Sequence, residues 1–372
     1  MRLSAEERLL LALCREEADF NVPADWDRFY RLVQDHKLSP LIHHNLKKMG
    51  GMVSAPSKIM DQMRTHTRTT ALANLLYEQK IYCLLKLFNQ DGIETIPIKG
   101  ITFSKMIYGK NMVRETCDID LLIRKKDVLK VDAILRGLSF TPTRDFAVLK
   151  NWQDVYSYGH YLKDEPLTPR YIVDIHWDFL PPEQSRPALL KKAWKRATPT
   201  EIDGNQIMVL SPEDILLFLS VKFAMDHIQR FLLRSICDIA NFLKVYKEKL
   251  DWGYILQECN RNKIATHLYF ALYFSEKLFG VDFPMEVRRK LKPTVIKRWL
   301  FKPLIQRRIF SKKSLTIKYS ISYLICYFLP TILSISSPRD IFWSLKVVSR
   351  RGCCFITKKM DKNFRKGILR RF

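Results

Sequence analysis

The chain has 372 residues, of which 47% are apolar and 27% charged, a globular balance that excludes a disordered, collagen-like or low-complexity protein. It carries 63 Lys and Arg residues against 38 Asp and Glu residues, a formal net charge of +25. Only 12 residues are glycine, and neither a G-x-G-x-x-G dinucleotide fingerprint nor a complete P-loop motif occurs.

The N-terminal part of the chain is predicted to be helical. Leu9 and Leu13 recur at helical spacing, and Asp25 stands where it can cap the helix that follows. A further leucine-rich helix is expected from about Ala71 to Phe88. We therefore assign residues 1–90 to a helical N-terminal region.

The pattern then changes to short β-branched runs that predict strands. These runs are Ile93 to Ile98, Asp118 to Ile123, Tyr171 to Phe179 and Ile207 to Leu210. Helices are expected between them, from Thr102 to Tyr108 and from Asp127 onward. Because the strands fall only in residues 91–210, the sequence predicts an α+β fold. Its centre would be a small mixed β-sheet core with helical N-terminal and C-terminal flanks.

A helix start follows the last predicted strand. Ser211 can cap the helix, Pro212 suits its first position, and Asp214 completes a capping box. The helical pattern continues to about Phe279, so residues 211–284 are predicted to be a helical region.

The positive charge is concentrated in the last part of the chain. Residues 285–372 hold 23 Lys and Arg residues against three acids, which is +20 of the total. This basic C-terminal tail predicts an anionic partner, either a membrane surface or RNA. It includes the uncharged run Tyr319 to Pro338, which is interrupted by Pro330. A membrane-surface segment, a spanning helix and a packed helical hairpin all remain open for this run.

Eight cysteines occur without C-x-x-C or zinc-ligand spacing, and the first residues contain no signal-peptide core. Free thiols and a cytoplasmic protein are therefore expected. If the tail contacts a membrane, the protein would lie peripherally at its inner face.

Three aspartates form the pattern that points to chemistry. Side chains alternate along a strand, so Asp118 and Asp120 share one face, and Asp174 stands on a strand of the same sheet. Neighbouring carboxylates repel each other, and a divalent cation removes that cost. Mg²⁺ prefers a few carboxylates together with phosphate oxygens, and paired metal ions serve phosphoryl displacement.

These motifs resemble the nucleotidyltransferase superfamily that includes DNA polymerase β. Within it, the sequence is similar to a bacterial family of nucleotidyltransferases with a Lys-Gly turn. The resemblance covers about residues 20–285 and rests on Lys99-Gly100, Tyr108, Arg114, Asp118-Ile-Asp120, Val173-Asp-Ile-His176-Trp177, Ser211 to Asp214, His227, Arg234 and Asp238.

The resemblance implies roles for these residues, and it implies that the helical region 211–284 covers the substrate or nucleotide. Asp118, Asp120 and Asp174 would be catalytic and would hold two Mg²⁺ ions. The NTP, such as ATP, would be bound by Lys99, Gly100, Arg114, His176, His227, Arg234 and Asp238. Other interpretations remain open for three of them. His227 would be a packed or capping residue of a helix, and Arg234 with Asp238 would be an i, i+4 ion pair on a helix surface.

The resemblance therefore implies an enzyme that transfers an NMP from an NTP to a hydroxyl of an acceptor. Most of the superfamily has Gly-Ser or Gly-Gly at the turn where Lys99-Gly100 stands here, so NTP and Mg²⁺ binding is implied more firmly than turnover. One alternative is a non-catalytic NTP-binding or scaffold protein of a biosynthetic cluster, such as one for a cell-surface polysaccharide. Another is an RNA-modifying transferase that holds RNA with the basic tail.

Overall fold

The computed structural model describes residues 3–17, 25–50, 55–109, 113–146, 148, 157–166, 170–180, 185–226 and 232–310. The chain divides into two compact units, Met1–Ser314 and Leu315–Phe372. All described residues belong to the first unit, and the uncharged run from Tyr319 to Pro338 lies outside them.

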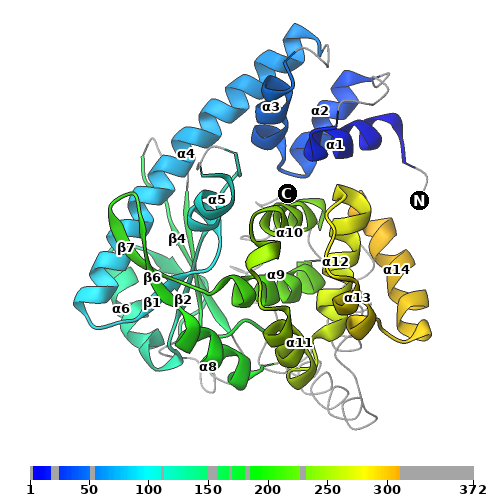
Figure 1. The fold of residues 1–372 in the computed structure, drawn as a ribbon. Coiled ribbons are helices and arrows are strands. Elements are labelled where there is room, and N and C mark those ends of the chain that lie inside the picture. Colours follow the sequence, from blue (N-terminus) through cyan, green and yellow to red (C-terminus); the bar gives the residue numbers. More distant parts are fainter. Residues whose placement is uncertain are drawn as a thin grey trace, which may run out of the picture. The chain divides into compact units, whose positions relative to one another are not determined.

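The centre of the first unit is a five-stranded sheet with the strand order β1-β2-β5-β4-β3. Neighbouring strands are antiparallel except for β2 and β5, which are parallel, so the sheet is mixed as the sequence predicted. A separate hairpin of β6 and β7 packs beside β1 (Figure 1). The strands are β1 (Thr95–Pro97), β2 (Ile119–Ile123), β3 (Thr141–Pro142), β4 (Tyr158–Lys163), β5 (Tyr171–His176), β6 (Thr198–Ile202) and β7 (Asn205–Val209).

The two faces of the sheet have opposite chemistry. Leu121, Val173 and Ile175 belong to the apolar face, which packs against helices α4 and α6. Because side chains alternate along each strand, Asp120 and Asp174 fall on the other face. The strand register places these two aspartates directly opposite each other on β2 and β5.

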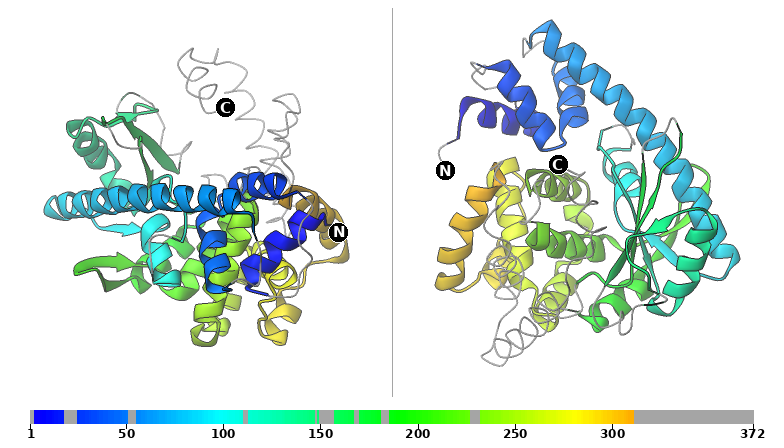
Figure 2. Two further views of the ribbon diagram at one scale, coloured as in Figure 1. Left: turned by 90° about the horizontal axis from the view of Figure 1, so that it is seen from above. Right: turned by 180° about the vertical axis from the view of Figure 1, so that it is seen from behind.

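One long helix joins the sheet to the N-terminal helices. Its buried residues recur at helical spacing from Ile59 to Phe88, and its second half packs on the sheet through Tyr77, Ile81 and Leu84. Its first half lies against α3 (Figures 1 and 2). The helices of this part are α1 (Ala5–Arg15), α2 (Trp26–Asp35), α3 (Ser39–Lys48) and the long α4 (Ser57–Gln90).

Among the described residues, three short helices and a 3-10 turn lie within the sheet region, and a helical bundle follows it. The first group is α5 (Gly100–Tyr108), the 3-10 turn Lys125–Asp127 with α6 (Val128–Gly137), and α8 (Pro187–Arg196). The second is α9 (Pro212–Asp226), α10 (Leu232–Tyr246), the 3-10 turn Lys247–Lys249, α11 (Trp252–Arg261), α12 (Ala265–Phe279), α13 (Met285–Leu291) and α14 (Val295–Ile309). The N-terminal helices touch this bundle, because Nε of Arg15 donates to the carbonyl oxygen of Leu278 (2.7 Å).

The first residues of the predicted basic tail are folded. Helices α13 and α14 begin at Met285 and Val295 and pack against α12 and α10. Within the part of the chain that the structure describes, no helix is both long enough and apolar enough to cross a membrane.

Several local predictions agree with the structure. Every strand among the described residues lies between residues 95 and 209, and the backbone N–H of Arg28 donates to Oδ1 of Asp25, which caps α2 (2.8 Å). The backbone N–H of Asp214 likewise donates to Oγ of Ser211 at the start of α9 (3.3 Å).

Other boundaries differ from the prediction. Helix α4 begins at Ser57 rather than near Ala71, because its first turns are rich in Thr, Arg and Lys and carry no continuous apolar stripe. Helix α5 begins at Gly100 rather than Thr102, and β5 ends at His176 rather than Phe179. Strands β3, β4 and β6 and helix α8 were not expected.

A close backbone approach at Gly159 provides a test of the core. A methyl group added there would lie 2.7 Å from Cε2 of Phe146, a ring that packs in the buried core. We expect Gly159→Ala to lower the free energy of unfolding by about 1–3 kcal/mol, because it overpacks a filled core. Urea unfolding followed by circular dichroism measures this.

Gly137→Ala is the matched control, since nothing lies within 4 Å of its added methyl group. Gly137 ends α6, where alanine is the better helix former, so stability should be unchanged or rise by up to about 1 kcal/mol. Equal stability of Gly159→Ala and the wild type would contradict the packing described here.

Candidate active site

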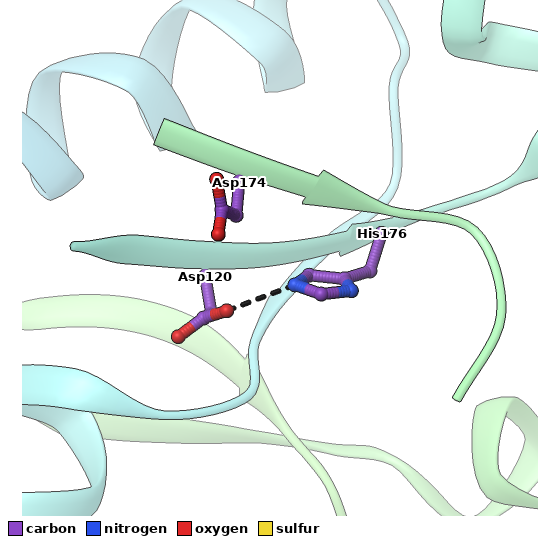
Figure 3. A group of neighbouring side chains, drawn as sticks. All are labelled: Asp120, Asp174 and His176. Atoms are coloured by element: carbon purple, nitrogen blue, oxygen red, sulfur yellow. Dashed lines mark hydrogen bonds and ion pairs between the residues drawn. The ribbon is translucent and has the colours of Figure 1, made fainter. Parts of the chain in front are cut away.

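Two aspartates and a histidine converge on the polar face of the sheet. Asp120 on β2 and Asp174 on β5 are cross-strand partners, and His176 ends β5 two residues later. One ligand atom from each side chain lies within 4.8 Å of those of the other two (Figure 3). Carboxylate oxygens and an imidazole nitrogen are common metal ligands, so this group has the donors and the spacing to hold a cation.

Each of the two carboxylates is oriented by a histidine. Nε2 of His176 donates a hydrogen bond to Oδ1 of Asp120 (2.8 Å), shown as the dashed line in Figure 3. His160, the cross-strand partner of Asp174 on β4, donates from Nδ1 to Oδ1 of Asp174. The ring of Tyr158 stacks on His176 with a centroid separation of 5.5 Å. Both carboxylates are therefore held in defined orientations on rigid strands.

Asp118 lies immediately before β2, near the same charges. Burial is the main cause that raises the pKa of Asp118 to about 6, and repulsion from Asp120 and Asp174 adds to it. The positive charges of Lys99 and Arg234 act in the opposite direction. A cation bound nearby would offset this repulsion and stabilise the ionised form of the Asp118 carboxyl group.

Asp120 responds differently to its surroundings. Burial alone would raise its pKa, yet the hydrogen bond from His176 holds the pKa of this carboxyl below its ordinary value. The charges of Lys99 and Lys222 act in the same direction. Asp120 is therefore ionised at neutral pH, ready to act as a charged ligand.

A helix N-terminus faces the same region of the sheet. Gly100 is the first residue of α5 and has φ +70°, a backbone conformation that favours glycine. An added Cβ there would lie 3.4 Å from Cγ2 of Thr116 and 3.5 Å from the carbonyl oxygen of Asp118. Oγ1 of Thr116, buried beside this turn, has no hydrogen-bond partner among the described residues.

Lys99 caps this helix without a side-chain hydrogen bond to it. Its Nζ lies 5.7 Å from the centre of the Phe218 ring on α9, and its charge acts on both Asp118 and Asp120. Backbone N–H groups at a helix start, together with a lysine, are a combination that binds phosphate.

The predicted nucleotide-binding residues Arg114 and Asp238 form a buried ion pair. Nε of Arg114 donates to Oδ1 of Asp238 (3.1 Å) and Nη2 donates to Oδ2 (3.0 Å), so the pair is bidentate. Their side chains are only 11% and 10% exposed. This pair ties the segment before β2 to α10.

The i, i+4 spacing of Arg234 and Asp238 allowed an ion pair between these two residues, but Arg234 has a different partner. Its Nη2 donates to the carbonyl oxygen of Glu115, close to the aspartates. His227 lies outside the described residues.

Three residues near the aspartates were not among those predicted from the sequence. His160 shares the face of Asp174 on an adjacent strand, Lys222 on α9 acts on Asp120, and Thr116 lies beside Gly100. Alternation in the run from Tyr158 to Lys163 was a usable signal for His160, because every second side chain points to the same face. Nothing in the local sequence around Lys222 or Thr116 indicates their position.

Comparison with protein families matches residues 22–280 to a family described as uncharacterised nucleotidyltransferases. The chain belongs to this family. The match spans the N-terminal helices from near α2, the whole sheet with the aspartates and the helices through α12. Every predicted site residue of this nucleotidyltransferase family member falls within the matched range.

Among solved structures, the chain is similar to an antigenic nucleotidyltransferase-like protein from Paracoccidioides brasiliensis. The two are 17% identical, with a TM-score of 0.31 over 54% of this chain and 91% of that one. At this level the similarity carries no argument about the site. The curated proteins contain no match.

The ion pair of Arg114 and Asp238 provides a test of what holds the site together. We expect Arg114→Met to lower the free energy of unfolding by roughly 3–5 kcal/mol, because it leaves the Asp238 carboxylate buried without its partner. Chemical unfolding of the variant and of the wild type measures the difference.

Arg170→Met is the control, because Arg170 also pairs with an aspartate, Asp164, but at side-chain exposures of 56% and 69%. Loss of an exposed pair should cost at most about 1 kcal/mol. If the two variants were equally stable, Arg114 would not be a structural residue.

Proposed function

We propose that this protein transfers an NMP from an NTP to a hydroxyl group of an acceptor, with release of pyrophosphate. The observation that carries the proposal is the pairing of Asp120 with Asp174 on one sheet face, with Asp118 immediately before β2. Membership of a nucleotidyltransferase family supports this reaction class.

The aspartates fit Mg²⁺ as the cofactor. Asp120 and Asp174 offer carboxylate oxygens within 4.8 Å of each other, and the raised pKa of Asp118 reflects negative charge that a cation would balance. We propose that these three residues hold two Mg²⁺ ions, with His160 and His176 fixing the orientation of Asp174 and Asp120. When bound, such ions activate the attacking hydroxyl and balance the charge on the leaving pyrophosphate.

The turn before α5 is the proposed triphosphate site. Lys99 would contribute one point charge, and Gly100 would allow the phosphates to approach the backbone N–H groups of the first helical turn. Oγ1 of Thr116 is a buried hydroxyl beside this turn that can donate to a phosphate oxygen.

The remaining predicted nucleotide-binding residues would have two roles, contact with the nucleotide and positioning of the segment before β2. Arg234 contributes positive charge near Asp118, so we propose that it faces the nucleotide. Arg114 and Asp238 would position the segment before β2 through their mutual ion pair rather than by contacting phosphate directly. His227 stays a prediction from the resemblance.

Substitution of Asp120 tests the metal site. We expect Asp120→Asn to abolish Mg²⁺-dependent NTP binding while the fold persists, because the variant removes a ligand charge. Mutation of a residue that only orients a metal ligand lowers metal affinity by about 10–100-fold. Removal of a ligand charge should therefore lower Mg²⁺-dependent NTP affinity by more than roughly tenfold. Calorimetric titration of each NTP with and without Mg²⁺ measures it, and circular dichroism checks the fold.

Asp164→Asn is the matched control, since Asp164 is an exposed aspartate paired with Arg170. It should bind NTP as the wild type does. If Asp120→Asn still bound NTP in a Mg²⁺-dependent way, Asp120 would not be a metal ligand. Binding without pyrophosphate release from any NTP, in the presence of cell extract as acceptor source, would favour a non-catalytic NTP-binding protein.

Substitution of Lys99 tests the phosphate turn. We expect Lys99→Ala to weaken NTP affinity by about 1–3 kcal/mol, the value of one charge-assisted contact. Lys130→Ala, at an exposed position of α6 on the other side of the sheet, should leave affinity unchanged. Unchanged affinity in Lys99→Ala, together with lower stability, would assign Lys99 to a structural role beside the aspartates.

A further inference from the structure

Helix α14 exposes a group of large apolar side chains near its start. Val295 is 71% exposed, Ile296 71% and Trp299 75%. Trp299 follows Val295 by four residues and Ile296 by three, so its side chain neighbours both of them on the helix surface. Clusters of exposed apolar side chains are typical of interaction surfaces, and tryptophan in particular combines a large apolar body with a polar N–H.

The surroundings of this patch are strongly basic. The segment from Met285 to Lys302 has one acid, Glu286, against seven basic residues. Two of the basic side chains, Arg289 and Lys292, are exposed just before the patch. The basic residues are Arg288, Arg289, Lys290, Lys292, Lys297, Arg298 and Lys302.

We propose that the start of α14 docks on an anionic phospholipid surface, with Trp299, Val295 and Ile296 entering the lipid interface. Apolar side chains with an adjacent cluster of lysine and arginine are the combination that binds anionic bilayers. Tryptophan is enriched at the headgroup level of membranes, where both its ring and its N–H are accommodated. The inference is independent of the proposed reaction and concerns a different part of the fold.

Charge argues against the other occupants of this patch. A second copy would bring the same basic surface, and like charges repel. The charged parts of the chain after Phe310 would repel the patch as well, because residues 311–372 hold 14 Lys and Arg residues against two acids. If the uncharged run Tyr319 to Pro338 covered the patch instead, the patch variant would unfold at a lower temperature than the wild type, and this result would overturn the proposal. RNA would satisfy the charge, but the aliphatic side chains of Val295 and Ile296 offer it neither hydrogen bonds nor stacking.

Vesicle binding by the full-length protein tests the proposal. The probes are vesicles of phosphatidylcholine alone and of phosphatidylcholine with phosphatidylglycerol. We expect flotation only with the anionic vesicles, weakening as salt rises. Replacing all three patch residues (Val295→Ser, Ile296→Ser, Trp299→Ser) should reduce binding by roughly tenfold or more, since it removes the apolar contact.

Two further variants test whether vesicle binding depends on these apolar residues in particular and on the positive charge beside them. Leu72→Ser with Leu75→Ser removes exposed apolar side chains of α4, which are 61% and 49% exposed, and should leave vesicle binding unchanged. Arg289→Gln with Lys292→Gln should weaken binding and reduce its salt dependence. Thermal unfolding should match the wild type in all three variants, because the altered side chains are exposed.

Three other results would overturn the proposal. The first is equal vesicle binding by the patch variant and the wild type, which would move membrane contact to other residues. The second is salt-sensitive RNA binding without vesicle binding. The third is a change of oligomeric state in the patch variant without vesicle binding by the wild type, which would make the patch a contact between copies.

Discussion

The site depends on one unfavourable placement: two carboxylates lie directly opposite each other across parallel strands. Asp120 and Asp174 cannot move apart, because the register of β2 and β5 and the apolar packing behind them hold both backbones in place. Placing like charges together costs free energy unless nearby groups compensate for it. His176 and His160 supply part of that compensation through one hydrogen bond to each carboxylate. A divalent cation held there, as we propose, would supply the rest.

Helices far apart in the sequence hold the segment that leads into β2. Nδ2 of Asn74 on α4 donates to the carbonyl oxygen of Arg114 (2.9 Å), and the Arg114 side chain pairs with Asp238 on α10. Arg234, one turn earlier on α10, donates to the carbonyl oxygen of Glu115. The approach to Asp118 is thus fixed from both sides, so the helices do more than cover the sheet. They set the position of the first aspartate relative to the other two.

Much of the sheet could be predicted from the sequence because strand patterns are local. Alternation in Asp118 to Ile123 and in Val173 to His176 assigned the aspartates to one face and the aliphatic residues to the other. The strand pairing agrees for Asp120 and Asp174, whereas Asp118 lies just before β2 begins. The full length of α4 could not be predicted, since its first turns contact α3 rather than the sheet and lack a continuous apolar stripe. His160 was missed because its relevance depends on β4 pairing with β5, a contact that no local pattern encodes.

The sequence by itself determined the α+β order of elements, the sheet face of Asp120, and the glycine turn after Lys99, because each depends on neighbouring residues in the chain. Only the tertiary structure decided which residues act together. Spacing allowed Asp238 to pair with Arg234, yet it pairs with Arg114, more than a hundred positions away in the chain. Partner choice of this kind depends on how helices and strands pack, and packing brings together side chains whose separation along the chain carries no information about their contact.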